Sequence, residues 1–127
     1  ITYGRLFSFA CECMERLEKQ GISACILKLN TVKPIDSGAV IGAKDFKYCF
    51  FFEEGISCGG IGEHFLCKLI ENDFTGKYTL TAIDDQYVEQ STVASALKKY
   101  KLDTDGMEEV ILKKIKCDGE LCGKEKT

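Results

Sequence analysis

The residues best suited to chemistry lie between Tyr48 and Gly62, in the sequence YCFFFEEGISCGGIG. An aromatic run with one cysteine ends at two adjacent carboxylates, Glu53 and Glu54. A glycine-rich turn follows, and an apolar helical pattern begins directly after it. We interpret this as a buried strand, a turn and a helix start, where open α/β sheets form binding crevices. This stretch is therefore the first candidate for a functional site.

The turn could hold an anion at the start of the helix, where backbone N–H groups lack intrahelical partners. The candidate residues for an anion site, or for a contact with another domain, are Glu54, Gly59, Gly60 and Gly62. The spacing departs from the dinucleotide fingerprint G-x-G-x-x-G, because Phe65 stands where the third glycine belongs. The clustered glutamates would also repel an anion. A tight architectural turn is therefore the favoured interpretation.

The sequence predicts no catalytic, cofactor-binding or metal-binding residue. Glu53 and Glu54 are neighbours, so on a strand they point to opposite faces and make no natural acid–base dyad. His64, the single histidine, has no carboxylate partner beyond its neighbours in sequence, and Asp84 and Asp85 are equally ambiguous at a strand end. The G-x-S-x-G, Walker A and H-E-x-x-H motifs do not occur.

Eight cysteines are present, and none of them forms a Cys-x-x-Cys pair. They are Cys11, Cys13, Cys25, Cys49, Cys58, Cys67, Cys117 and Cys122. Most occupy apolar positions of predicted helices or strands, where a free cysteine behaves as a small hydrophobic residue. We predict reduced structural thiols in a cytoplasmic protein rather than a zinc site or a disulfide framework.

Composition excludes several classes of partner. The formal charge of −3 and the lack of a basic stripe argue against nucleic acid. No apolar run approaches the roughly 20 residues that span a bilayer, and no signal-peptide pattern occurs at the start. The chain opens at Ile1 on a strand-like run, as expected for a piece of a longer protein.

Periodic apolar residues predict strands alternating with helices. We expect strands over residues 1–3, 22–29, 48–54 and 78–83, with helices between and after them. This order predicts an α/β fold of three αβα layers, with a mostly parallel, doubly wound sheet of about five strands. We expect one domain over residues 1–116 and a polar, flexible tail over residues 117–127.

Five segments together resemble the C-terminal domain of the transketolase family almost from end to end. They are TYGRLFSFA, GISACILKLNTVKPID, FFEEGISCGGIGEHF, AIDDQYVEQST and KYKLDTDGMEEVI. The TVKPID and EEG-x-x-x-GG-x-G segments are shared with pyruvate dehydrogenase β subunits. The YVEQST and LDTDGM segments are most similar to the 1-deoxy-D-xylulose-5-phosphate synthase branch, although Ser91 stands where that branch usually has glycine.

The resemblance implies a longer transferase that uses thiamine diphosphate and Mg²⁺. Such an enzyme condenses pyruvate with glyceraldehyde 3-phosphate, releases CO₂, and supports isoprenoid, thiamine and pyridoxal synthesis. Its partners would be the preceding domains of the same polypeptide and a second copy in a homodimer. The Gly-Asp-Gly…Asn motif that holds the metal and diphosphate is absent here, so the resemblance assigns this chain a structural and interaction role without activity of its own.

Two other functions stay open. The chain could be the C-terminal domain of a transketolase or an oxo-acid dehydrogenase β subunit, used for subunit docking. It could also be a stand-alone module that binds a phosphate-bearing ligand between Gly59 and Gly62. The residues encoded before Ile1 would discriminate among these alternatives.

Overall fold

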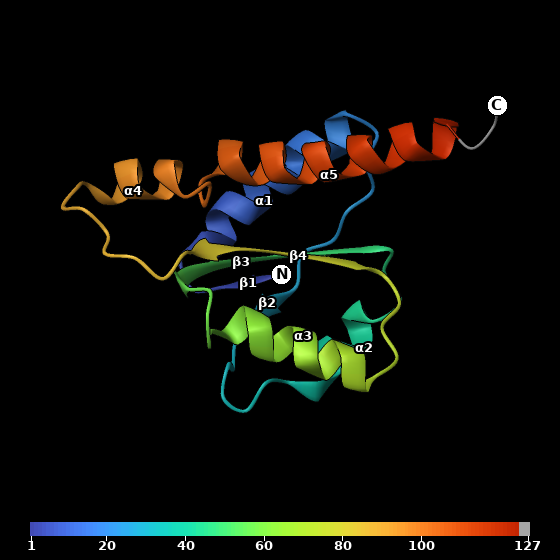
Figure 1. The fold of residues 1–127 in the computed structure, drawn as a ribbon, viewed down its shortest axis with the longest axis horizontal. Helices are drawn as coiled ribbons and strands as arrows, with labels where there is room; N and C mark the ends of the chain where they lie inside the picture. The colour runs from blue at the N-terminus through green and yellow to red at the C-terminus, as the bar shows by residue number, and fades with distance from the viewer. Residues whose placement is uncertain (125–127) are drawn as a thin grey trace.

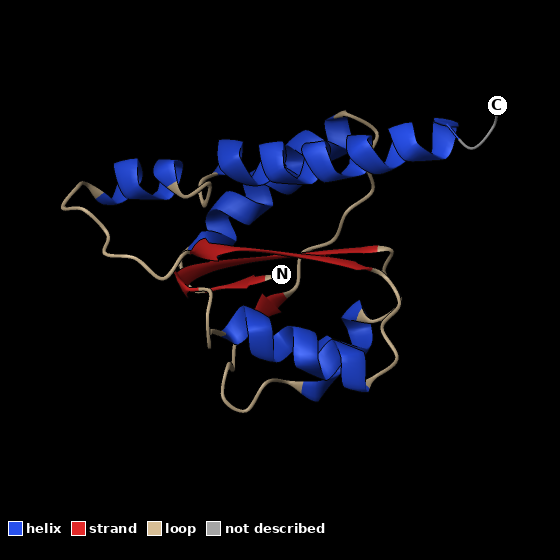
Figure 2. Ribbon diagram, viewed as in Figure 1, coloured by secondary structure: helices blue, strands red, loops and turns tan. Residues whose placement is uncertain are grey.

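A computed structural model describes the backbone of residues 1–124 and the side chains of residues 1–119. In this part of the chain, one sheet lies between two layers of helices (Figure 1 and Figure 2). The neighbouring strands are β2 (Lys28–Leu29), β1 (Thr2–Tyr3), β3 (Tyr48–Ile56) and β4 (Lys77–Ile83). All of their pairings are parallel. The three-layer α/β prediction is confirmed, with four strands in the described residues rather than about five.

The helices divide between the two faces of the sheet. One face is covered by α1 (Leu6–Lys19) and α5 (Thr104–Lys124), and the other by α2 (Ser37–Ala43) and α3 (Ile61–Glu71), as Figure 1 shows. The short α4 (Val93–Lys99) lies in the same layer as α5 (Figure 1). The chain therefore alternates between sheet and helix until β4 and then ends in two helices.

Apolar periodicity explains α1 and α3. Leu6, Cys13 and Leu17 lie on the buried face of α1, and Gly21 follows with a φ of 77°, a left-handed conformation that favours glycine at a helix end. Phe65 and Leu69 are the fully buried side chains of α3. Each set recurs at intervals of three or four residues, which places it on one side of the helix.

The core lies on both faces of the sheet. On the side of α2 and α3, the rings of Phe51 and Phe65 meet in a tilted arrangement, with centroids 5.6 Å apart. On the other side, Leu6 and Met107 pack with Phe52. Phe51 and Phe52 are successive residues of β3 and point to opposite faces, so one strand supplies aromatic side chains to both halves of the core.

The second strand is much shorter than expected. The sequence predicts a strand over residues 22–29, but only Lys28 and Leu29 pair. β2 lies at the edge of the sheet, so its single neighbour is β1. β1 begins at Thr2, which pairs with Lys28 and whose N–H donates to the Leu27 carbonyl at 3.1 Å, so residues 22–26 have no strand to pair with.

The later elements agree with the sequence except at the end of the chain. Thr92 caps α4 by accepting a hydrogen bond from the backbone N–H of Ser95 at 3.2 Å, as predicted. The last helix continues through Lys124 and does not end at the expected domain boundary before Cys117. Residues 125–127 of the expected tail lie outside the described residues, and the flexibility of residues 117–127 stays a prediction.

No helix within residues 1–124 combines the length and the apolar character that crossing a membrane requires.

Two neighbouring residues of α3 provide a test of this packing. Leu69 is fully buried, whereas Ile70 is 62% exposed. We expect Leu69→Ala to lower the free energy of unfolding by about 3 kcal/mol, because the substitution leaves a cavity in the core. Ile70→Ala should change it by no more than about 0.5 kcal/mol. Urea denaturation followed by circular dichroism measures both values, and equal losses would contradict the orientation of α3.

Candidate functional site

The strand–turn–helix segment brings the carboxyl end of β3 to the start of α3. Its two carboxylates separate as the sequence predicts. Glu53 is only 3% exposed and points toward α3, whereas Glu54 points away and binds Arg5. The register between β3 and β4 shifts between Phe52 and Ile56. This irregularity lies at the two glutamates, where a bulge can redirect side chains at the end of a strand.

The Glu53 carboxylate fills the N-terminus of α3. Its Oε1 accepts hydrogen bonds from the Tyr3 hydroxyl at 2.7 Å and from the Ile61 backbone N–H at 2.9 Å. Its Oε2 accepts from the Gly62 N–H at 3.0 Å. A helix N-terminus attracts negative charge through its free N–H groups and its dipole. The chain supplies that charge itself.

The rest of the turn is also internally bonded. The Gly59 N–H donates to a side-chain oxygen of Glu63 at 2.7 Å, and the Gly60 N–H donates to the Ser57 carbonyl at 3.3 Å. Together with the two amides that bind Glu53, every backbone N–H from residue 59 to residue 62 is engaged. An external phosphate would have to displace these groups, and the carboxylates of Glu53 and Glu63 would repel it.

Gly60 and Gly62 are required because neighbouring atoms lie too close to them for a side chain. A Cβ atom on Gly60 would lie 2.6 Å from the Ile56 carbonyl oxygen and 2.7 Å from Oε2 of Glu53. A Cβ atom on Gly62 would lie 2.3 Å from a methyl carbon of Leu80 in β4. The glycines therefore allow α3 to approach both the carboxylate and the sheet, as an architectural turn requires.

Two tyrosines connect the site to the sheet. Burial raises the pKa of Tyr3, and its hydrogen bond to Glu53 raises this pKa further. The Tyr78 hydroxyl donates to the Gly62 carbonyl at 2.7 Å, and burial likewise raises the pKa of Tyr78. Both hydroxyls therefore stay protonated and act as hydrogen-bond donors from β1 and β4 to the start of α3.

The second carboxylate belongs to the surface. Nε of Arg5 donates to Glu54 at 2.7 Å, and a second contact joins the same two side chains. Hydrogen bonding to Arg5 lowers the pKa of Glu54. This ion pair links the turn after β1 to the end of β3, but both side chains are partly open to water. The ion pair therefore orients these two surface segments and contributes little to the stability of the fold.

The other polar candidates do not assemble into a centre. His64, Asp84 and Asp85 are all exposed. Among the described residues, no three histidine, cysteine, aspartate or glutamate side chains are grouped closely enough to hold a metal ion. The sequence-based prediction that the chain holds no catalytic residue stays a prediction.

With this geometry in place, comparison with known proteins identifies the family. The family model described as "Transketolase, C-terminal domain" matches residues 1–107. The chain belongs to this family. The resemblance inferred from the sequence motifs is confirmed.

Curated relatives point to one branch of the transketolase family. A 1-deoxy-D-xylulose-5-phosphate synthase of Clostridium botulinum (strain Eklund 17B / Type B) is 32% identical over 89% of this chain. A protein of the same name from Marinomonas sp. (strain MWYL1) is 33% identical over 74% of the chain. The matched regions are 18% and 15% of these relatives, so the chain spans less than a fifth of their length.

The fold is also found in a solved structure. A protein described as "Split gene transketolase, inactive beta4 tetramer" superposes with a TM-score of 0.73 at 22% identity. The superposition covers 88% of this chain and 36% of that one. At this identity the likeness concerns the fold alone.

A feature that sequence reasoning missed is a set of exposed apolar side chains at or after the ends of two strands of this transketolase-type domain. Ile56 ends β3, and Tyr87, Val88 and Val93 lie in or just after the loop that follows β4. All four are at least about half exposed, and Tyr87 is fully exposed. We call these four residues the carboxyl-edge patch, because they lie at the carboxyl end of β3 or follow the carboxyl end of β4 in sequence. Tyr87 and Val88 stand out as apolar residues inside the polar segment DDQYVEQS, which was the available signal.

The buried carboxylate gives a specific prediction. Glu53→Gln replaces one accepting oxygen by an N–H₂ group, which leaves at least one of its three donors without a partner. We expect the free energy of unfolding to fall by about 2 kcal/mol, because a buried polar group then stays unsatisfied. Urea denaturation at neutral pH measures the change.

Glu54→Gln is the matched control for Glu53→Gln. It alters the adjacent carboxylate, whose partner Arg5 is exposed, and should lower the free energy of unfolding far less. If Glu53→Gln proved as mild as Glu54→Gln, Glu53 would not be the structural anion of α3.

Proposed function

We propose that this chain is the C-terminal domain of a 1-deoxy-D-xylulose-5-phosphate synthase, where it serves as a structural and docking domain. The observation that carries this proposal is the match of most of the chain to less than a fifth of relatives with that name. The longer protein would join pyruvate to glyceraldehyde 3-phosphate with loss of CO₂. The first partners of the domain are then the preceding domains of the same polypeptide.

The thiamine diphosphate and Mg²⁺ of such an enzyme do not fit this domain. A diphosphate needs free donors, yet the amides from residue 59 to residue 62 bind groups of the chain itself. The described residues also offer no cluster of metal-binding side chains. We therefore assign the cofactor and the chemical step to the other domains of the longer protein.

The docking surface that we propose is the carboxyl-edge patch. Covering the fully exposed ring of Tyr87 with another surface would remove its apolar area from water, which is favourable. Ile56 of the patch stands between Glu54, the partner of Arg5, and the glycine turn in sequence, so apolar and charged groups occur together at this end of β3. This combination of an aromatic residue with a polar rim is typical of contacts between protein surfaces.

The longer enzyme is further proposed to be a cytoplasmic homodimer. The seven cysteines described by the structure are free thiols, as is typical of a reducing compartment. The homodimer follows from the resemblance to the family, and light scattering on the full-length protein tests it.

A substitution in the patch tests the docking role. In the full-length enzyme, we expect Tyr87→Asp to lower the rate of pyruvate decarboxylation with glyceraldehyde 3-phosphate about tenfold, because a buried charge opens the contact between domains. The melting temperature of the isolated chain should not change, since the Tyr87 side chain is fully exposed and the substitution removes no buried packing.

Ile70→Asp is the control for Tyr87→Asp. It introduces the same charge at another exposed apolar residue, at the far end of α3. Equal loss of rate in both variants would contradict a docking role for the patch. A full-length protein that does not consume pyruvate and glyceraldehyde 3-phosphate would overturn the proposed enzyme.

A further inference from the structure

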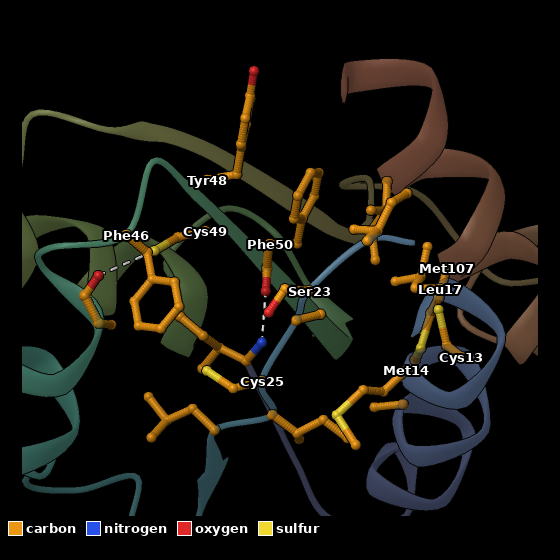
Figure 3. A pocket seen from close by; sticks show the side chains of 18 of the residues that line it. Cys13, Met14, Leu17, Ser23, Cys25, Phe46, Tyr48, Cys49, Phe50 and Met107 are labelled. Carbon is orange, nitrogen blue, oxygen red and sulfur yellow. Dashed lines mark hydrogen bonds between the residues drawn. The ribbon is translucent and has the colours of Figure 1, made fainter. Parts of the chain in front are cut away.

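A largely apolar hollow of about 330 Å³ lies at the end of the sheet opposite the carboxyl-edge patch. Figure 3 shows it between α1, the start of α5, the beginning of β3 and the segment 22–27. Leu17 and Met107 line it from the helices, Cys25 lines it from the segment 22–27, and Cys49 lines it from β3. Protein interiors are close-packed, so a hollow of this size beside the core indicates a missing occupant.

Ile1 stands inside this hollow and identifies the kind of occupant. Its nitrogen donates to the Phe50 carbonyl at 2.6 Å (Figure 3), and its carbonyl accepts from the Phe52 N–H at 3.0 Å. These two bonds are rungs of a parallel ladder. Burial lowers the pKa of the Ile1 ammonium to about 6, because the charged form loses its hydration. The position therefore suits a neutral peptide N–H, which makes the same bond without a charge.

The register of the sheet shows where a longer strand would run. Thr2 pairs with Lys28 on one side and with Phe52 on the other. Counting back, the three positions before Ile1 would lie between two rows of residues that all line the hollow. The rows are Ile26, Cys25 and Ala24 on the side of β2, and Phe50, Cys49 and Tyr48 on the side of β3.

We propose that the hollow receives an extended segment of three residues joined covalently to Ile1, which lengthens β1 and pairs in parallel with residues 24–27 and with β3. The source is the part of the longer polypeptide directly before Ile1. A separate peptide in the same register would bring its carboxylate against the buried Ile1 nitrogen, whereas a continuous chain places an amide there. The chain's match to less than a fifth of its relatives' length is consistent with such a continuation.

The side chains of this segment follow from strand alternation. Ile1 and Tyr3 pack against the core cluster beneath α2 and α3, so Thr2 faces the layer of α1 and α5. The residue before Ile1 shares the face of Thr2 and meets Leu17 and Ile111. The one before it shares the face of Ile1. Both environments are apolar, so the segment should carry apolar side chains at these two positions.

The segment also accounts for the short second strand. Residues 22–27 are apolar and free of glycine and proline, as expected of a strand. With β1 extended, residues 24–26 would acquire the neighbour that they lack, and β2 would run over residues 24–29, close to the predicted range of 22–29.

Three forms of the chain test the proposal: the chain from Ile1, the chain preceded by Val-Ala-Val, and the chain preceded by Gly-Ser-Gly. Both extensions convert the Ile1 ammonium to an amide, but only Val-Ala-Val supplies apolar side chains and strand propensity. Continued pairing would engage the backbone N–H groups of Leu27 and Phe50. We expect hydrogen exchange at these two amides, measured by NMR, to slow about tenfold in the Val-Ala-Val form relative to the Gly-Ser-Gly form.

The urea midpoint is the second measurement. It should rise in the order Ile1 form, Gly-Ser-Gly form, Val-Ala-Val form. Equal exchange at Leu27 and Phe50 in both extended forms, or a Val-Ala-Val midpoint no higher than that of Gly-Ser-Gly, would overturn the proposal. Neither measurement uses enzyme activity, so failure here is distinguishable from failure of the proposed synthase.

Discussion

The fold depends on the carboxylate of Glu53 at the start of α3. It joins β3 to the distant β1 and to the start of α3, because its donors are the Tyr3 hydroxyl and the N–H groups of Ile61 and Gly62. An ionised group is costly to bury unless its oxygens are bonded, and here three donors supply that compensation. The same contacts fix the angle at which α3 leaves the sheet. The glycines of the turn are needed because the carboxylate and Leu80 leave no room for a Cβ atom.

Much of this architecture follows from local patterns in the sequence. The apolar stripes of α1 and α3, the Thr92 cap and the aromatic run of β3 each contain the signal for their own structure. The separation of Glu53 from Glu54 followed from strand alternation alone. Such features depend on residues a few positions apart, and the structure confirms them.

The remaining features depend on distant residues, so the local patterns could not indicate them. The sequence leaves an anion site in the glycine turn as one candidate, because nothing in the sequence shows that Glu53 points back into the turn. The length of β2 depends on where its neighbour β1 begins, which the pattern of residues 22–29 does not record. The exposure of Tyr87 likewise depends on which surfaces the loop after β4 fails to contact.

The order of the strands has a kinetic consequence. β3 and β4 are consecutive strands linked by α3, and they share the longest ladder of the sheet. β1, in contrast, pairs over only two residues with β2 and at one with β3, and its pairing with Phe52 closes a loop of about fifty residues, whose lost chain entropy so short a ladder compensates poorly. Folding should therefore nucleate on β3, α3 and β4, with β1 entering the sheet late. Transition-state φ-values near zero around Thr2 and near one in α3 would be the signature of this order.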